Sequence, residues 1–318
     1  MKTKLITLES ASIDLYKFQW QGASPRDSFA IVGALHGDNF NALHICARLI
    51  EFLDRIENDE SSEYKIQGKI QIFPTLNVPA SQTGLHVWPA DGLDSNLSFP
   101  GSRQGEPEEQ MARAVYEEIF DAHAGILINS GARHYEDTPH LQCYKAHSEE
   151  RKMAFASGLP ILREICPTPT HRAQLFSQWD DKQTPALIFS GGSLGSLSQN
   201  YCDLAFQGIL NILLVLKILR QNKKFEANSE LLFFTSNREV IIRNQNPGLF
   251  QPKTSVGKFL KQGEVIGIIT DPLSGKILEE IIAPEKGTLV VLRHLPIIYQ
   301  SETAAILLSD KKKSLWPF

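Results

Sequence analysis

Apolar runs alternate with amphipathic segments from about residue 28 to residue 220, and this alternation most constrains the fold. The run SFAIVGAL (28–35) is followed by a polar turn and then by FNALHICARLIEFLDRI, whose apolar residues recur every three or four positions as in a helix. Further strands are expected at KIQIFPTL, AGILINSG and PALIFSGG, and further helices at 106–123, at 147–157 and through ILNILLVLKIL to about Arg220. Such alternation predicts an α/β domain whose mostly parallel sheet is covered by helices on both faces.

The pattern changes after about Glu226. Short strand-like runs such as EVIIRN, EVIGIIT, GTLVVLR and AAILLSD are separated by the turn signals NPG, KQG, PLSG and PEKG. A chain of 318 residues is long enough for one large unit and a smaller one. We therefore predict an α/β domain over residues 1–225 and a small all-β, barrel-like domain over residues 226–318.

Composition narrows the possible partners and compartment. A net charge of −4 with 21% charged residues gives no electrostatic attraction to nucleic acid or to an anionic membrane. The most apolar stretch (209–219) is too short to span a bilayer and contains Asn211 and Lys217, so it predicts a buried helix. The four cysteines are far apart and form no CxxC pair, and the N-terminus lacks the apolar core of a signal peptide. We expect a cytoplasmic protein without disulfides.

Five short motifs stand out, four of them at the ends of expected strands and one in the long segment after residue 77. They are GALHGDN (33–39), LNVPA (76–80), DGLDSNLSFPG (91–101), LINSG (127–131) and PALIFSGG (185–192). The first places His36 between a strand and a helix, where α/β proteins bind ligands. In this order, and with the β module after them, the motifs resemble the succinylglutamate desuccinylase/aspartoacylase family of zinc carboxypeptidase-like proteins. The resemblance implies a mixed central sheet flanked by helices.

The resemblance also implies where a zinc site would lie. In that family a His and a Glu from an H-x-x-E turn hold zinc together with a His from a later strand. The matching positions here are His36, Asn39 and Asn129. Because an amide oxygen is a poor replacement for a carboxylate or an imidazole at zinc, we interpret these three as vestigial metal positions without zinc.

The catalytic positions implied by the resemblance are replaced as well. The family's general base, a Glu, falls on Ser190, which cannot act as a base near neutral pH without a partner. The family's two arginines fall on His86 and Leu97, and Asn96 is expected beside them as a substrate-binding residue. The expected cavity therefore contains only uncharged hydrogen-bonding groups, which favours an uncharged polar ligand.

A different metal centre is the main alternative. Asp38 and the stretch GARHYEDTPH, which contains His134, Glu136, Asp137 and His140, supply candidate ligands. Without a regular frame this stretch has no defined ligand geometry, so a polar surface loop is the preferred interpretation. A serine hydrolase is disfavoured because the G-x-S-x-G elbow is absent.

These observations leave three functions open. The first is a protein of this fold that has lost zinc-dependent amide hydrolysis, needs no cofactor and binds a small polar ligand or a partner. The alternative is an active metal-dependent deacylase of N-acyl amino acids or related amides, with zinc in an altered site. The third is a structural role. The sequence does not indicate an oligomeric state.

Overall fold

A large sheet forms the centre of the computed structural model, which describes residues 1–8, 13–24, 27–222 and 231–310. Before residue 223 it takes strands from the whole chain, joined in the order β1-β2-β5-β3-β6-β9-β7, with β8 pairing β7. The strands are β1 (Lys2–Leu8), β2 (Ile13–Gln21), β3 (Ser28–Ala34), β5 (Lys69–Thr75), β6 (Ala124–Ile128), β7 (Tyr135–Cys143), β8 (Ile161–Glu164) and β9 (Ala186–Gly192).

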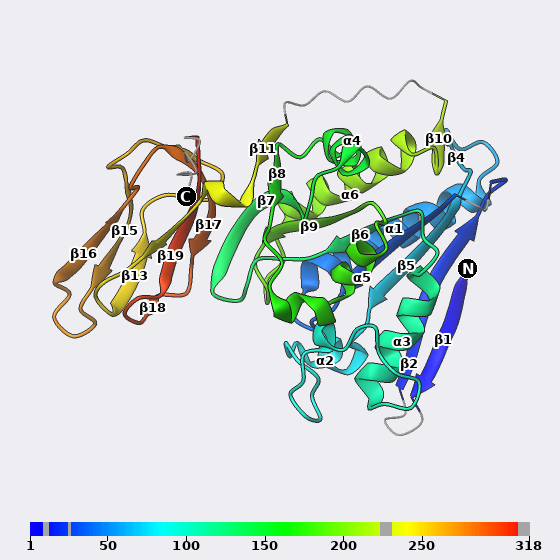
Figure 1. The fold of residues 1–318 in the computed structure, drawn as a ribbon, viewed down its shortest axis with the longest axis horizontal. Coiled ribbons are helices and arrows are strands. Elements are labelled where there is room, and N and C mark those ends of the chain that lie inside the picture. Colours follow the sequence, from blue (N-terminus) through cyan, green and yellow to red (C-terminus); the bar gives the residue numbers. More distant parts are fainter. Residues whose placement is uncertain (9–12, 25–26, 223–230, 311–318) are drawn as a thin grey trace, which may run out of the picture.

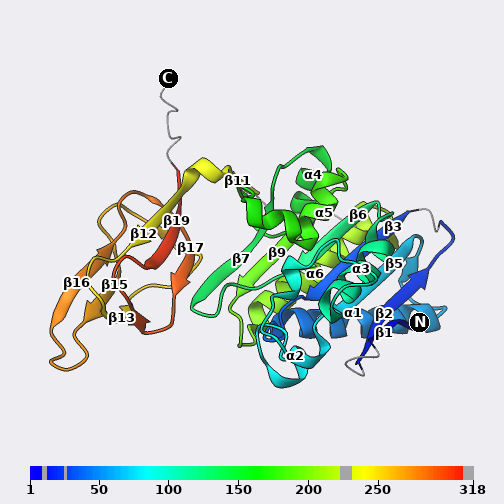
Figure 2. The same ribbon diagram turned by 60° about the horizontal axis from the view of Figure 1, so that its bottom comes forward.

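The sheet is mixed, as predicted. Strands β5, β3, β6 and β9 run parallel, while β1 and β2 pair antiparallel with their neighbours. Strand β7 pairs antiparallel with β9 and parallel with β8. All seven residues of β3 and of β9 are buried, which is why both read as continuous apolar runs. Figures 1 and 2 show the helices packed over the two faces of this sheet.

Two glycines show how closely the helices approach opposite faces. A Cβ on Gly191 of β9 would lie 2.4 Å from Tyr201, and one on Gly125 of β6 would lie 2.6 Å from Trp179. Gly125 pairs with Ala186, five residues before Gly191, so the two glycines point to opposite faces. The helices are α1 (Phe40–Asn58), α2 (Val78–Thr83), α3 (Pro107–Ile119), α4 (Ser148–Ser157), α5 (Leu175–Asp181) and α6 (Gln199–Val215).

The predicted helix through residue 220 ends earlier than expected. Helix α6 stops at Val215, and Leu219–Gln221 forms strand β10, which pairs with β4 (Tyr64–Ile66). The reason is Lys217, whose φ of 61° lies in the left-handed region and cannot continue a right-handed helix.

Strands β7, β1 and β2 of the sheet were not expected from the sequence. The prediction of a polar surface loop after Gly131 is wrong. Residues 135–143 form β7, which lies between β9 and the C-terminal strands. The hairpin β1–β2 was not predicted either. In both cases polar residues that pack inside the protein hide the strand pattern, since Lys17, Asp137 and His140 are all buried.

After β11, which pairs parallel with β8, the chain forms antiparallel strands with a hydrophobic core of their own. One four-stranded sheet has the order β16-β15-β13-β18, and β17, β19 and β12 continue the central sheet beyond β7. Figure 1 shows this part as a lobe beside the helices. Its strands are β11 (Leu232–Phe234), β12 (Glu239–Arg243), β13 (Gly248–Pro252), β14 (Phe259–Leu260), β15 (Val265–Thr270), β16 (Ile277–Ile282), β17 (Gly287–Arg293), β18 (Ile297–Ile298) and β19 (Thr303–Ser309).

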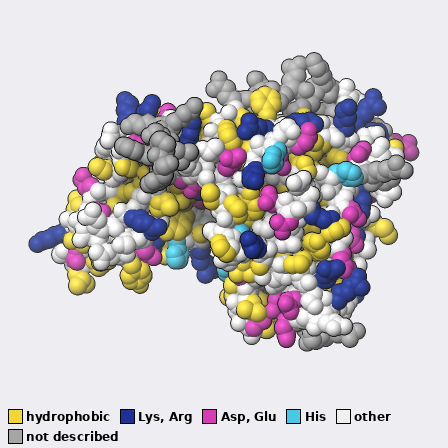
Figure 3. All heavy atoms as spheres, viewed as in Figure 1, with side chains coloured by type: hydrophobic (Ala, Val, Ile, Leu, Met, Phe, Trp, Pro, Cys, Tyr) yellow, Lys and Arg dark blue, Asp and Glu magenta, His cyan; other side chains and the backbone are white. Residues whose placement is uncertain are grey.

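The predicted boundary between residues 225 and 226 lies in 223–230, outside the described residues, and stays a prediction. None of the described helices combines the length and the hydropathy needed to cross a membrane. On the face in Figure 3, acidic and basic side chains are interspersed.

Candidate functional site

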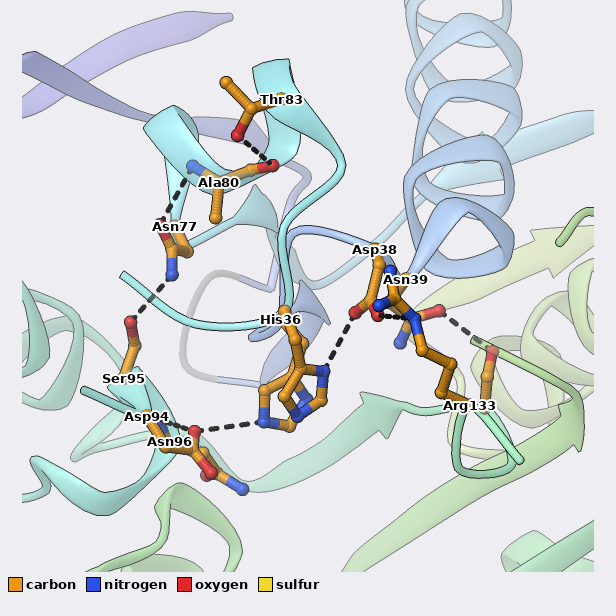
Figure 4. A network of polar contacts seen from close by, with 12 residues as sticks. His36, Asp38, Asn39, Asn77, Ala80, Thr83, Asp94, Ser95, Asn96 and Arg133 are labelled. Atoms are coloured by element: carbon orange, nitrogen blue, oxygen red, sulfur yellow. Dashed lines mark hydrogen bonds and ion pairs between the residues drawn. The ribbon is translucent and has the colours of Figure 1, made fainter. Parts of the chain in front are cut away.

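The turn that carries His36 lies between the end of β3 and the start of α1. A Cβ on the next residue, Gly37, would lie 2.1 Å from the carbonyl carbon of Ala80, so only glycine allows this turn to pack against α2. Asn77 caps α2 by accepting a hydrogen bond from the Ala80 amide at 3.1 Å, and it donates to Ser95 Oγ at 3.1 Å. These contacts hold the His36 turn, α2 and the loop after it together (Figure 4).

Two stacked imidazoles form the centre of the site. The rings of His36 and His86 lie with their centroids 4.1 Å apart and their planes 11° apart. His36 Nε2 donates to Asp94 Oδ1 at 3.0 Å, and His86 Nδ1 donates to Asp38 Oδ1 at 3.0 Å. Each histidine therefore has its own carboxylate partner.

Asp38 is the most deeply buried charge of the site. Its side chain is 0% exposed, and its Oδ2 has no hydrogen-bond partner, although Arg133 Nε lies 3.6 Å away. The Arg133 side chain is 61% exposed and comes from the loop after β6. The site thus combines a buried carboxylate with an accessible guanidinium.

The electrostatics follow from these pairs. Burial acts to raise the pKa of Asp38, but the hydrogen bond and charge of His86, together with Arg133 and His36, bring it below its ordinary value. The hydrogen bond to Asp38 raises the pKa of His86 more than burial lowers it. Asp94 behaves like Asp38: the hydrogen bond and charge of His36 outweigh burial and lower its pKa.

The expectation of a cavity with only uncharged groups is wrong. Asp38, Asp94 and Arg133 are charged and lie at or beside the two histidines. The prediction failed because it considered only the positions matched by the family motifs. Asp94 and Arg133 lie beside those positions, and their contacts with the His36 turn exist only in the folded chain.

Asn39 is fully engaged within the protein. It caps α1 by accepting from the Ala42 amide at 3.2 Å, and its Oδ1 also accepts from Ser130 Oγ at 2.9 Å. Its Nδ2 donates to the Ile128 carbonyl at 3.3 Å, and the residue is 1% exposed. The Asn39 amide would have to give up some of these hydrogen bonds to bind a metal.

The three positions that the resemblance implies for zinc do not fit a zinc ion. Of the three, only His36 is an imidazole; Asn39 is an amide whose oxygen caps its own helix, and Asn129 is an amide as well. In the part of the chain that the structure describes, no three His, Cys, Asp or Glu residues are grouped so that they could hold a metal. The candidate ligands Asp38, His134 and His140 are therefore not brought together as a metal site.

Ser190 and its neighbours form a buried polar cluster in the sheet. Ser190 Oγ donates to Asp137 Oδ2 at 2.9 Å, and burial raises the pKa of Asp137 to about 6. His140 is opposite Ser190 in the ladder between β7 and β9, and burial lowers its pKa to about 3. Its Nδ1 donates to the Thr138 carbonyl at 2.7 Å, so His140 is a neutral core histidine.

The remaining predicted site residues, Asn96, Leu97 and Asn129, differ in their surroundings. Asn96 lies next to Asp94, whose Oδ1 accepts from the Asn96 amide at 2.9 Å, while Asn96 Oδ1 accepts from the Leu175 amide. Leu97 is exposed. The backbone of Asn129 is bonded to the Phe189 carbonyl and to the Tyr201 hydroxyl. The roles predicted for these residues remain predictions.

The mixed sheet and the helices over it define a metallo-carboxypeptidase-like α/β fold. A metallo-carboxypeptidase from Burkholderia cenocepacia has this fold, with a TM-score of 0.52 and 14% identity over 68% of this chain and 64% of that one. The model of the succinylglutamate desuccinylase/aspartoacylase catalytic domain matches residues 25–135. The predicted resemblance to this family is therefore confirmed.

Two further proteins are similar over most of the chain. The N-alpha-acetyl-L-2,4-diaminobutyric acid deacetylase of Halomonas elongata is 22% identical over 87% of this chain and 80% of its own length. The crystal structure of a succinylglutamate desuccinylase/aspartoacylase from Rhodobacter sphaeroides has a TM-score of 0.78 and 18% identity, covering 95% and 90% of the two chains. These comparisons support a deacylase-like function.

Proposed function

We propose that this chain binds N-acyl amino acids or related amides at the site around His36 and His86, without hydrolysing them through zinc. The main support is that the carboxamide of Asn39 is hydrogen-bonded within the protein. Because Asn129 is an amide as well, His36 is the one zinc ligand of the family that remains among the three positions. The substrate class is suggested by the deacetylase of Halomonas elongata, which is named for an N-acetylated amino acid.

The side chains at the site are suited to such a ligand. Arg133 is exposed and offers a guanidinium to a carboxylate, while Asp94 and the ring of His86 offer an acceptor and an apolar face beside it. An N-acyl amino acid carries a carboxylate, an amide N–H and an acyl group that would use these three features.

Hydrolysis of the same amides is the second candidate function. The comparisons favour it over a loss of activity, because the matched model describes a catalytic domain and the relative is a deacetylase. In this case donors other than Asn39 and Asn129 have to complete a metal site with His36. Zinc would then supply the Lewis acidity that the family's chemistry uses.

One set of measurements separates the candidates. The full chain is purified without chelator, its zinc is measured by elemental analysis, and N-acetyl amino acids are tested by calorimetry and by a hydrolysis assay. Binding without turnover, with well below one equivalent of zinc, supports the first function. Turnover that is lost with the metal in His36→Ala, but not in the control His44→Ala on α1, supports the second. Neither binding nor turnover would overturn both.

A further inference from the structure

A hollow of about 510 Å³ lies where helix α6 ends and strand β10 begins, beside β4 (Figure 1). Asp27, the residue before β3, is part of its lining. Because His36 follows the other end of β3, the length of this strand places the hollow on the order of 20 Å from His36. The hollow is therefore separate from the candidate site.

Two basic side chains, Lys217 and Arg220, line the hollow and are exposed to solvent. The ion pairs between described residues involve neither of them. Arg220 also lies directly opposite Lys65 in the antiparallel ladder between β10 and β4, and like charges in this position repel each other. An anion bound beside Arg220 would offset this repulsion.

The side chain of Lys217 is not needed to end α6. The Lys217 amide donates to the Leu214 carbonyl at 3.0 Å, and the Ile218 amide donates to the Leu213 carbonyl at 2.9 Å, so backbone amides satisfy these carbonyls at the helix end. Lys217 has a φ of 61°, in the left-handed region where glycine is less strained. What lysine adds to glycine at this position is the charged side chain, which lines the hollow.

Hydrogen-bond donors accompany the two cations. Ser24, Gln67 and Gln221 also line the hollow and offer a hydroxyl and two amide groups. Asp27 is the acidic residue of the lining, so two cations and one carboxylate leave an excess of positive charge. A phosphate monoester carries close to two negative charges near neutral pH and has three outer oxygens, which can accept from both cations and from the amides together.

The hollow is larger than a phosphate group alone requires. Leu214 and Leu219 belong to its lining, and cavities of this size hold small organic molecules. An apolar group attached to the phosphate would contact these leucines and leave water, which is favourable. The hollow therefore favours an organic phosphate over the inorganic ion.

We propose that this hollow binds a small phosphate monoester, with Lys217 and Arg220 donating to the phosphate oxygens and the organic group against Leu214 and Leu219. The site is separate from the one around His36, and its occupation does not depend on the function proposed there.

The test uses phenyl phosphate as the probe and the full chain at pH 7.5. By calorimetry we expect phenyl phosphate to bind about tenfold or more tightly than phenol, which lacks the charge. Inorganic phosphate, which lacks the ring, and benzoate, which carries a single negative charge, are both expected to bind more weakly than phenyl phosphate. Equal affinity for inorganic phosphate would show an adventitious ion only, and equal affinity for benzoate would contradict the phosphate class. No binding of phenyl phosphate would overturn the proposal.

Two variants then test the cations themselves. Arg220→Gln and Lys217→Gly are each expected to raise the Kd for phenyl phosphate about tenfold, because a charged donor is lost. Lys217→Gly should keep or raise the melting temperature, since glycine suits the φ of 61°, so weaker binding would not result from unfolding. The matched control Lys253→Gln changes an exposed lysine after β13 and should leave the Kd unchanged. An unchanged Kd in either folded variant would overturn the proposal.

Discussion

The ring of His86 lies flat against the ring of His36 at a centroid distance of 4.1 Å, in a position where the family resemblance places an arginine. The two stacked imidazoles each donate to a carboxylate, His36 to Asp94 and His86 to Asp38. The negative charge of each carboxylate offsets repulsion between the two rings. These four residues form a hydrogen-bonded network beside the positions that the resemblance implies for zinc.

The pair of Asp38 and His86 makes the stability of the fold depend on pH. The raised pKa of His86 means that the pair stabilises the folded chain below the ordinary histidine pKa of about 6.5 and that this contribution is lost as the pH rises through the raised value. The lowered pKa of Asp38 means that the contribution is also lost as the pH falls through that value. The pair therefore contributes most at about pH 5.

Asp38→Asn tests this dependence. We expect the variant to be less stable than the unmodified chain at about pH 5 and the difference to shrink at about pH 9, as measured by urea unfolding at a series of pH values. The pKa of His86, followed by NMR, should move down in the variant because its main raising cause is removed. Asp91→Asn, in the exposed loop, serves as the control. A stability difference that is independent of pH would count against the pair.

Asp137 affects stability in the opposite direction. Its pKa of about 6 is above the ordinary value of 3.8, so the folded chain loses stability as the pH rises through this interval. Asp137→Asn should remove this loss and stabilise the chain above pH 6, by up to about 3 kcal/mol for a shift of this size. The difference in free energy of unfolding between the variant and the unmodified chain is measured by denaturant unfolding at pH 4 and pH 7. If the stability of the variant depends on pH in the same way as that of the unmodified chain, the pKa of Asp137 is not raised in the folded protein.

The close approach of Gly37 to Ala80 predicts a steric effect at the site. Gly37→Ala places a methyl group 2.1 Å from the backbone of α2, and overpacking of this kind costs roughly 1–3 kcal/mol. Gly158→Ala is the matched control, because its φ of 78° is strained but no atom lies within 4 Å. Urea unfolding compares the two. A smaller loss for Gly37→Ala than for Gly158→Ala would mean that the turn and α2 can separate at little cost.

Restoring the family ligands tests the assignment of the zinc positions. The double variant Asn39→Glu/Asn129→His is expected to take up close to one equivalent of zinc, because three ligands then meet at His36. Loss of the Asn39 cap should cost about 1 kcal/mol of stability in the same variant. Adding His36→Ala should abolish the gained zinc. If the double variant gains no zinc by elemental analysis, these positions do not face one another.

Local patterns predicted the elements that lead to the site. The apolar run of β3, the period of α1 and the glycine of the turn depend on residues close together in the sequence, and the structure has each of them. The length of α6 was predicted less well, because its end depends on the backbone of Lys217 and not on hydrophobicity. Strand β7 was not predicted at all, since its polar residues Asp137 and His140 are buried and Asp137 is bonded to Ser190 on β9.

Sequence periodicity alone therefore determined the fold class and the turn that carries His36, because burial of apolar faces imposes periods of two or 3.6 residues on nearby positions. Only the tertiary structure decided which side chains surround that histidine. The contacts of Asp94 with His36 and of His86 with Asp38 join residues that are separated in the chain by α1, β4, β5, α2 and part of the loop after α2. The path of that loop sets such distances, and it depends on the packing of α2 against Gly37, which no local pattern encodes.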